Sequence, residues 1–247
     1  MRHPNSTATK VTLIAGLMAT GAAQAGTVAL NYQDAFHGGY VTTAVSTNGN
    51  TTSTGGPTYQ NTLTGGLKFE TSHMIGDPEV VTGSILAWCI EIAQTTASGG
   101  ERIDYTTSTL AAQTWVGSLQ KLINQRFKEV MEGTPGENTK MLSAAMQLAV
   151  WELVTDKRPG NLSDGNLRVQ QIGTDTASLS ARSVAKAQEW LSTLGTAQET
   201  GNYRIVVLKN DVKQDQITVS AVPLPGASFL LGSALLGFMT ISRRSKV

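Results

Sequence analysis

The chain contains a single cysteine, Cys89, in the stretch "LAWCIEI". A cysteine is the side chain best suited to nucleophilic or covalent chemistry, and a lone one cannot form an internal disulfide. In an exported protein, which meets an oxidising compartment, three states are open to such a thiol. Cys89 is buried as a small inert hydrophobic residue, bonded to another chain, or modified in some other way.

Gln147 is the second residue that invites chemistry, because it interrupts "SAAMQLAVWELVTD", a stretch otherwise typical of a buried helix. At helical spacing Ser143 and Ala144 precede it by one turn, so another backbone can approach there, and Trp151 follows by one turn and can exclude water. A buried amide without partners costs about 1–3 kcal/mol. Gln147 therefore needs a partner, which is either a loop carbonyl that pins the helix or the region of Cys89.

Other catalytic or metal-binding groups have little support in the sequence. His37 and His73 have no neighbouring Cys or His at ligand spacing, so we expect surface positions, no metal site and no cofactor. Glu91 and Glu152 could form a carboxylate pair, but two glutamates on separate elements are ordinary. No serine lies in a G-x-S-x-G motif. We therefore predict that the protein is not an enzyme.

The segment around Cys89, "EVVTGSILAWCIEIAQ", predicts one or two strands that end near Gln94. Alternation places Cys89 on one face with Ile85, Ala87 and Glu91. The opposite face holds Leu86, Trp88, Ile90 and Ile92. That second face is the more apolar, so we expect it to pack on the core and Cys89 to lie on the more polar side.

Three helices are predicted by apolar residues at helical spacing. The first runs from about Ser108 to "EGTPGE", and the second, which carries Gln147, runs from about Thr139 to Asp156 with Asn138 or Thr139 as its cap. The third runs from about Ala181 to Leu194 and stops at Gly195.

Strands are expected on both sides of these helices. The segment 41–66 is rich in Thr, Ser, Asn and Gly, which favours turns and polar strands over helix. After the helices, "YRIVVLK" and "QITVSAV" each predict a strand. The order strands, helices, strands predicts an α+β fold, an antiparallel β sheet or sandwich with an inserted bundle of about three helices.

The N-terminal segment has the pattern of an export signal. Arg2 and Lys10 give a positive start, "VTLIAGLMATGAA" gives a short apolar run, and "AQA" at 23–25 gives a cleavage site of small residues. A buried N-terminal helix is the alternative. We predict a signal peptide at 1–25 and an extracytoplasmic domain at 26–222.

The C-terminal segment 223–247 has three parts: a turn at Pro223 and Pro225, an apolar run over 227–241, and a basic tail with Arg243, Arg244 and Lys246. The apolar run is somewhat short against the ~20 residues of a usual span, which tilting or thinning can absorb. We predict a C-terminal transmembrane helix whose basic end stays in the cytoplasm. The tail resembles the PEP-CTERM sorting signal in its VPLP-type variant, which implies an exosortase-type processing enzyme, passage through the inner membrane and release to the surface. A plain single-span anchor is the alternative.

The two central motifs together resemble the thioester domains of bacterial surface proteins. "AWCIEI" matches the aromatic-Cys motif, and "MQLAVW" matches the Thr-Gln-x-Ala motif with Met146 in place of Thr. The resemblance extends from about Leu67 to Val222. It implies an internal thioester between the Cys89 sulfur and the Gln147 side-chain carbonyl, and an activated acyl group of this kind reacts with a nucleophile on a target surface.

The expected function follows from this resemblance and from the ends of the chain. A thioester requires close approach of sulfur and carbonyl carbon and a dry site, for which we expect Trp88 or Trp151 as the shield and Glu91 or Glu152 in proton transfer. The resemblance implies a covalent adhesin or matrix-associated protein whose partner is a surface nucleophile or an exopolysaccharide matrix. The formal net charge of +1 and the lack of a basic patch give no reason to expect nucleic acid. The alternative is a non-covalent matrix protein with an inert buried cysteine.

Overall fold

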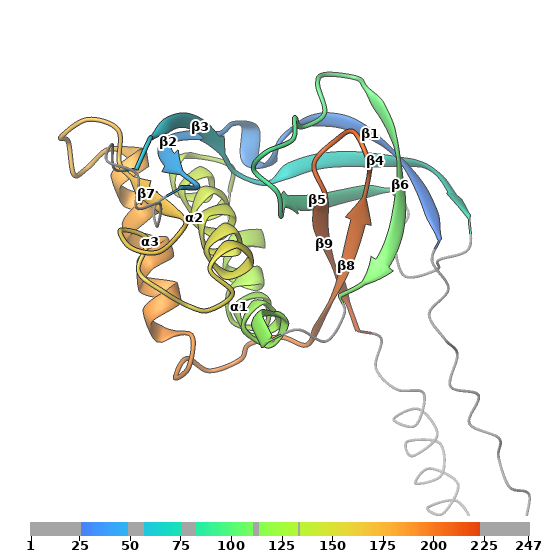
Figure 1. Cartoon of the computed structure of the whole chain (residues 1–247). Helices are drawn as coiled ribbons and strands as arrows, with labels where there is room; N and C mark the ends of the chain where they lie inside the picture. The colour runs from blue at the N-terminus through green and yellow to red at the C-terminus, as the bar shows by residue number, and fades with distance from the viewer. Residues whose placement is uncertain (1–25, 49–56, 76–82, 111–113, 133, 223–247) are drawn as a thin grey trace, which may run out of the picture.

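The computed structural model describes residues 26–48, 57–75, 83–110, 114–132 and 134–222. Within them the chain forms a β-barrel on one side and a group of three helices on the other (Figure 1). The α+β class, the three helices and the antiparallel pairing of the strands are all confirmed. The signal peptide at 1–25 and the transmembrane helix and sorting motif predicted within 223–247, with Pro223, Pro225, Arg243 and Arg244, lie outside the described residues.

The main sheet closes on itself. Its strands follow the order β1-β4-β5-β9-β8-β6 around the barrel, and each pairs antiparallel with its neighbours. Their bounds are β1 Thr27–Ala35, β4 Leu67–Ile75, β5 Ser84–Cys89, β6 Arg102–Thr109, β8 Tyr203–Lys209 and β9 Gln216–Ala221. Closure pairs every strand on both sides and leaves this sheet without an exposed edge. The barrel is thus a closed form of the predicted antiparallel sheet.

A second, smaller sheet lies on the helical side of the molecule, where its strands contact two of the helices. It contains β3 Gln60–Thr64, β2 Val41–Ser46 and β7 Arg168–Gln170 in the order β3-β2-β7. A short 3-10 turn, η1 Phe36–Gly38, joins β1 to β2, and β3 continues through Gly65 and Gly66 into β4. The polar segment 41–66 therefore does form strands where it is described, and it connects the barrel to the helical side.

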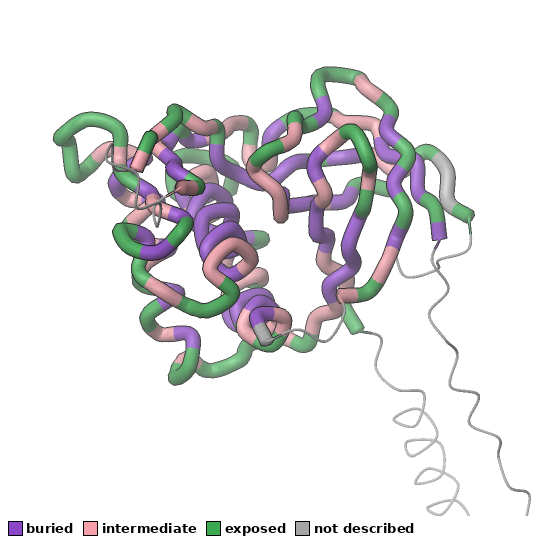
Figure 2. The backbone as a smooth tube through the Cα atoms, in the orientation of Figure 1, coloured by how far each residue is buried: buried purple, intermediate pink, exposed green. Residues whose placement is uncertain are grey.

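Helix α2 (Glu137–Thr155) occupies the centre of the molecule, packed between α1 (Thr114–Met131), α3 (Leu179–Thr193) and the end of β5 (Figure 1). Its sequence is apolar or small on every side, which is typical of a helix without a solvent face. Almost every residue from Thr139 to Leu153 is buried, as the tube in Figure 2 shows. Because this helix has no polar face to turn toward solvent, its composition explains its position in the core.

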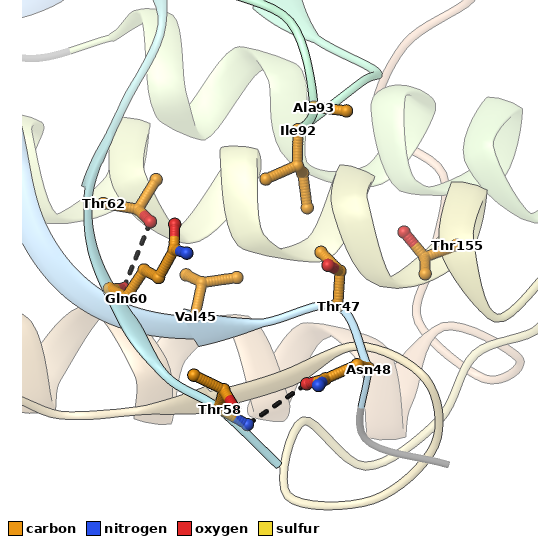
Figure 3. A pocket seen from close by; sticks show the side chains of 9 residues that line it. All are labelled: Val45, Thr47, Asn48, Thr58, Gln60, Thr62, Ile92, Ala93 and Thr155. Carbon is orange, nitrogen blue, oxygen red and sulfur yellow. Dashed lines mark hydrogen bonds between the residues drawn. The ribbon is translucent and has the colours of Figure 1, made fainter. Parts of the chain in front are cut away.

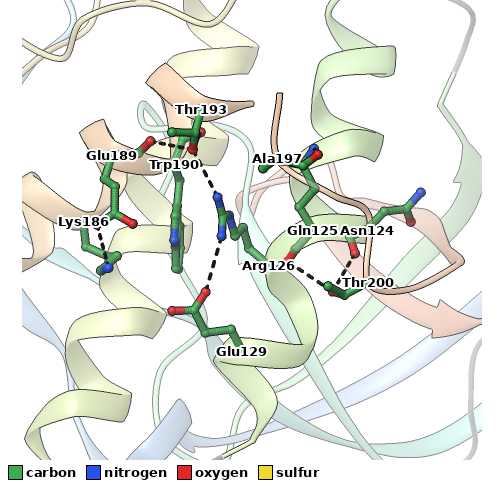
Figure 4. Close-up of polar contacts among 10 residues, drawn as sticks. All are labelled: Asn124, Gln125, Arg126, Glu129, Lys186, Glu189, Trp190, Thr193, Ala197 and Thr200. Atoms are coloured by element: carbon green, nitrogen blue, oxygen red, sulfur yellow. Dashed lines mark hydrogen bonds and ion pairs between the residues drawn. The ribbon is translucent and has the colours of Figure 1, made fainter. Parts of the chain in front are cut away.

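Polar contacts fix α1 against α3 and the loop that follows it (Figure 4). The Arg126 guanidinium lies over the Trp190 ring, 5.9 Å from its centroid, and donates to the Thr193 hydroxyl at 3.1 Å. Gln125 Nε2 donates to the carbonyl oxygens of Leu194 and Ala197. These bonds hold the end of α3 and the following loop against α1, and the chain then returns to the barrel at β8.

Two predicted boundaries are wrong. The first helix begins at Thr114 rather than near Ser108, because Ser108 and Thr109 belong to β6 and pair with Val207 and Val206 of β8. The strand at Cys89 ends at that residue and does not continue to Gln94. Non-local pairing decides both: β6 continues through Thr109 because β8 pairs with it there, and β5 ends where its register with Gln216 of β9 ends.

The predicted faces of β5 are also wrong. Ile85, Ala87 and Cys89 are all buried, and Trp88 on the opposite face is buried as well, whereas Leu86 is only half-buried. The barrel interior takes one face of the strand and the helices cover the end of the other. Cys89 therefore does not lie on a polar side of the sheet.

No helix among the described residues is long and apolar enough to cross a membrane.

Candidate functional site

The structure brings Cys89 and Gln147 together. The Cys89 backbone N–H donates to Gln147 Oε1 at 3.0 Å, and Gln147 Nε2 donates to the Cys89 carbonyl oxygen at 2.7 Å. Both residues are buried, with exposed fractions of 4% and 1%. The whole amide of Gln147 thus faces the main chain of the residue that carries the thiol, and its carbonyl carbon lies between the two bonded atoms.

The local sequence explains why the two elements meet at this point. Cys89 is the last residue of β5 and lies opposite Gln216 of β9. The next backbone hydrogen bond to that side is donated by Ile90 N–H to Asp215 O. The N–H and C=O of Cys89 are therefore free to bond the helix. The predicted close approach one turn earlier is present, since the Gly66 N–H donates to Ser143 Oγ at 2.8 Å. The small Ser143 side chain therefore lets the start of β4 approach the helix one turn before Gln147.

The two tryptophans proposed as shields occupy different places. Trp151 lies with Cys89 and Gln147 on the wall of one cavity. Trp88 is fully buried on the opposite face of β5, where its ring meets Phe36 and Phe127 edge-on at centroid distances of 6.5 and 6.0 Å. Trp151 is placed to limit water at the pair, whereas Trp88 closes the helical side of the strand.

A cavity of about 640 Å³ opens onto the Cys89–Gln147 pair. Its wall comes from segments far apart in the sequence: β1 and the start of β2, β3, the loop after β5, α2, and the turn before β9. Tyr32 and Tyr40 stand on this wall, and their hydroxyls are 2.9 Å apart. The pair is therefore buried but lies on the wall of a cavity that opens to solvent.

Burial governs the protonation of the groups around the pair. It raises the pKa of the Cys89 thiol to about 12, so a free thiol here is protonated at neutral pH and is a poor nucleophile toward outside reagents. Burial and the hydrogen bond to Tyr32 raise the pKa of Tyr40 well above its usual value. Neither group supplies a base at neutral pH.

The two carboxylates considered for proton transfer lie elsewhere. Glu91 Oε2 accepts a long bond from the Asp215 backbone N–H at 3.4 Å and is not on the cavity wall. Glu152 is 1% exposed and also off that wall, and its pKa is raised to about 8, first by burial and then by repulsion from Asp156. Their contacts are with different partners, so the structure offers no carboxylate pair and no acid at Cys89 from these two residues.

The described residues include no group of three or more His, Cys, Asp or Glu side chains that could hold a metal ion. The His37 ring Nε2 is 3.0 Å from the Val130 carbonyl oxygen, which makes it the donor of a bond between η1 and the end of α1. The ring is half-buried rather than fully on the surface. The side chain of His73 is not among those that the structure describes.

Several residues at the site escaped the sequence-based prediction. Tyr32, Tyr40, Gln94 and Gln214 reach the cavity from segments that carry no motif, and only the fold assembles them. Gly66 is different, because the pair Gly65-Gly66 between two strands was a visible signal of close backbone approach. A Cβ at Gly66 would stand 3.1 Å from the Trp88 indole.

Comparisons with known proteins give a distant likeness of fold. No family model matches the chain, and no curated protein matches it at a significant level. Among solved structures, it is similar to the N-terminal domain of the Streptococcus pyogenes pilus tip adhesin Cpa, with a TM-score of 0.43 and 14% sequence identity over 78% of this chain and 99% of that one. So remote a likeness assigns no role to any residue, and the inferences that follow rest on the contacts of Cys89 and Gln147.

Proposed function

We propose that the protein is an exported surface protein that attaches covalently to a target through a thioester between Cys89 and Gln147. The observation that supports the proposal is the pair of hydrogen bonds between the Gln147 amide and the Cys89 main chain. The thiol is two bonds from the Cys89 Cα, and that Cα lies between the two bonded backbone atoms. We infer that a change of the Cys89 side-chain rotamer brings the sulfur to the amide carbon.

The chemistry balances without a cofactor. The Cys89 sulfur attacks the Gln147 Cδ, the C–N bond breaks, the thiol proton passes to the leaving nitrogen, and ammonia departs. When a target amine later attacks the same carbon, an amide bond forms, the C–S bond breaks, and a proton passes from the amine to the sulfur. Each molecule acts once, so we expect no turnover.

The surroundings of the pair suit both steps. Burial of both side chains limits hydrolysis of the thioester. Because the thiol and the amide are held close together, the activation barrier of the attack is lowered even though the thiol is protonated. The cavity beside Trp151 supplies the path by which a target group arrives. The export signal and sorting tail expected at the two ends of the chain would place this chemistry outside the cell.

The decisive experiment is the intact mass of the mature protein isolated from cells. We expect a mass lower than the calculated value by one ammonia and no reaction of Cys89 with thiol reagents. Mild treatment with an amine should release the free thiol and raise the mass by that of the added amine. The Cys89→Ser protein serves as the control and is expected to show its full calculated mass. An unmodified mass together with a free thiol in the native chain would refute the proposal.

A second candidate function has its own supporting observation. In the structure both polar atoms of the Gln147 amide are already satisfied by main-chain groups, which is what a purely structural pin would require. The protein would then be a non-covalent matrix component with an inert buried cysteine. Surface retention that is unchanged by Cys89→Ser, with a full native mass, would favour this second function.

A further inference from the structure

The cavity over the reactive pair continues into a second one. The two share Gln60, Thr62 and Ile92 on their walls, and the second, of about 520 Å³, runs along β2 and β3 as far as Thr155 at the end of α2. Figure 3 shows its lining, with Thr58 N–H bonded to Asn48 Oδ1 and the Thr62 hydroxyl bonded to the Gln60 carbonyl. We call the two cavities together the groove. A ligand that enters at Cys89 can extend along it as a chain.

The described side chains that line the groove carry no formal charge at neutral pH. They are amides, hydroxyls, aromatic rings and small apolar groups, with no Lys, Arg, His, Asp or Glu among them. An anionic or cationic ligand would lose its hydration there without gaining an opposite charge. The lining suits a neutral ligand rich in groups that both donate and accept hydrogen bonds.

Unpartnered polar atoms on the wall near the pair indicate the same ligand chemistry. The Gln94 and Gln214 Oε1 atoms and the Trp151 indole N–H are buried and have no hydrogen-bond partner, and Gln214 is only 6% exposed. These three residues line the same cavity, and their two acceptors and one donor match hydroxyl groups once side-chain motion turns the atoms toward a ligand. The half-buried Tyr32 and Tyr40 rings supply apolar surface on which a sugar ring can pack.

The choice of nucleophile follows from the lack of a base. Among the described residues on the cavity wall, the titratable side chains left once Cys89 is acylated are Tyr32 and Tyr40, and burial keeps Tyr40 protonated. A lysine amine, with an ordinary pKa of about 10.4, would arrive as an ammonium and find nothing to take its proton. A hydroxyl is a weak nucleophile without a base. An amine that titrates near neutrality reaches the acyl carbon already unprotonated.

We propose that the target is an amino sugar within a neutral, hydroxyl-rich glycan, which lies in the groove and attacks the Gln147 acyl carbon with its unprotonated amine. The inference rests on the proposed thioester and specifies its substrate class. The attacking nitrogen forms an amide bond to Cδ, the C–S bond breaks, and one amine proton passes to the Cys89 sulfur. The product is a glycan joined to Gln147 and a free thiol at Cys89.

Adduct formation measured by intact mass tests the proposal with four amines offered separately to the mature protein at pH 7.5. Hydroxylamine reports the thioester itself, glucosamine is the proposed class, glycinamide matches its low pKa without hydroxyls, and cadaverine is a lysine-like cation. We expect glucosamine to react about tenfold faster than glycinamide, the effect of one or two neutral hydrogen bonds, and faster still than cadaverine.

The outcomes separate the two proposals. Equal rates for glucosamine and glycinamide, or a preference for cadaverine, would overturn the amino-sugar inference while a hydroxylamine adduct still upholds the thioester. No adduct with any of the four amines would reject the thioester and the inference with it.

A matched pair of variants locates the recognition. Gln214→Met removes an amide with an unpartnered oxygen from the cavity wall with little change in volume, and we expect it to lower the glucosamine rate far more than the hydroxylamine rate. Gln33→Met makes the same replacement at an exposed position that is on neither wall of the groove, and should leave both rates unchanged. If the Gln214→Met protein still prefers glucosamine, Gln214 does not take part in recognising the sugar.

Discussion

The side-chain amide of Gln147 takes the place of a peptide group at the end of β5. Its oxygen accepts from the Cys89 N–H and its nitrogen donates to the Cys89 C=O, at the residue where β5 ends. The same contact therefore explains why an amide is tolerated in the most buried helix of the molecule and why the thiol-bearing residue lies beside it. The structural contact and the proposed thioester chemistry therefore involve the same residue.

The contribution of the Gln147 hydrogen bonds to stability can be measured in a Cys89→Ser background. No thioester forms there, and both bonds to the main chain remain possible. Replacing Gln147 by Met there leaves a buried N–H and a buried C=O unpaired, so we expect the free energy of unfolding to fall by about 2–4 kcal/mol. Chemical denaturation provides the measurement. Gln171→Met, at a half-exposed position outside this contact, is the control. A loss below about 0.5 kcal/mol would contradict the bonding seen here.

Glu152 predicts a pH dependence. Burial and Asp156 raise its pKa from 4.5 to about 8, with Arg158 acting weakly the other way, so the folded state holds this proton more tightly than the unfolded chain. Its contribution to stability is therefore complete below about pH 4.5 and falls as the pH rises toward 8.

The Glu152→Gln variant should remove that loss. Relative to the parent it should gain stability on the order of a few kcal/mol between pH 5 and pH 8, and its unfolding free energy should vary less across this range. Parallel pH profiles for the two proteins would show that Glu152 is ionised in the folded state.

At the scale of the elements, α2 is held by close approaches as much as by apolar contact. Gly66, at the junction of β3 and β4, bonds Ser143 and leaves no room for a side chain beneath the Trp88 indole. The glycine thus sets how near the barrel comes to the helix, and with it the distance between Cys89 and Gln147. The helix N-terminus is fixed by the Thr139 hydroxyl, which accepts from the Gly136 N–H at 2.9 Å.

Two glycine-to-alanine changes separate this packing effect from backbone entropy. Gly66→Ala places a methyl 3.1 Å from the Trp88 indole and 3.3 Å from Ser143 Oγ, and we expect a loss of about 1–3 kcal/mol. Gly117→Ala, on the exposed side of α1 with no atom within 4 Å of the new Cβ, should instead stabilise by about 0.5–1 kcal/mol. Thermal unfolding of both measures the difference. A Gly66→Ala protein as stable as the parent would mean that the strand can move away from the helix.

At the scale of the whole molecule, the described domain combines a closed barrel with a helical cover (Figure 1). The groove is lined by residues of the barrel, the small sheet and α2. Closure leaves no strand edge of the barrel unpaired, which limits association with other chains through this sheet. The expected export signal at 1–25 and sorting tail at 223–247 lie outside the described residues.

Deleting residues 227–247 tests the role of the C-terminal segment without touching the described domain. We expect the truncated protein to leave the envelope and appear in the medium or the periplasm, because the apolar run and the basic tail are the expected anchor. Fractionation followed by immunoblotting measures this, and the intact mass of the released protein shows whether the thioester still forms. If the truncated chain remains bound to the envelope, the tail is not its anchor.

The sequence by itself determined the helices and the pair of candidate residues, since both follow from local rules. The all-round apolar pattern of α2 requires burial, and Cys89 and Gln147 stand out because each is exceptional within its own element. Only the tertiary structure decided the closure of the sheet, the end of β5 and the burial of both its faces, because these depend on which distant strand supplies the hydrogen bonds. It also decided the groove, whose walls bring Tyr32, Gln94 and Gln214 together from positions that no period in the sequence connects.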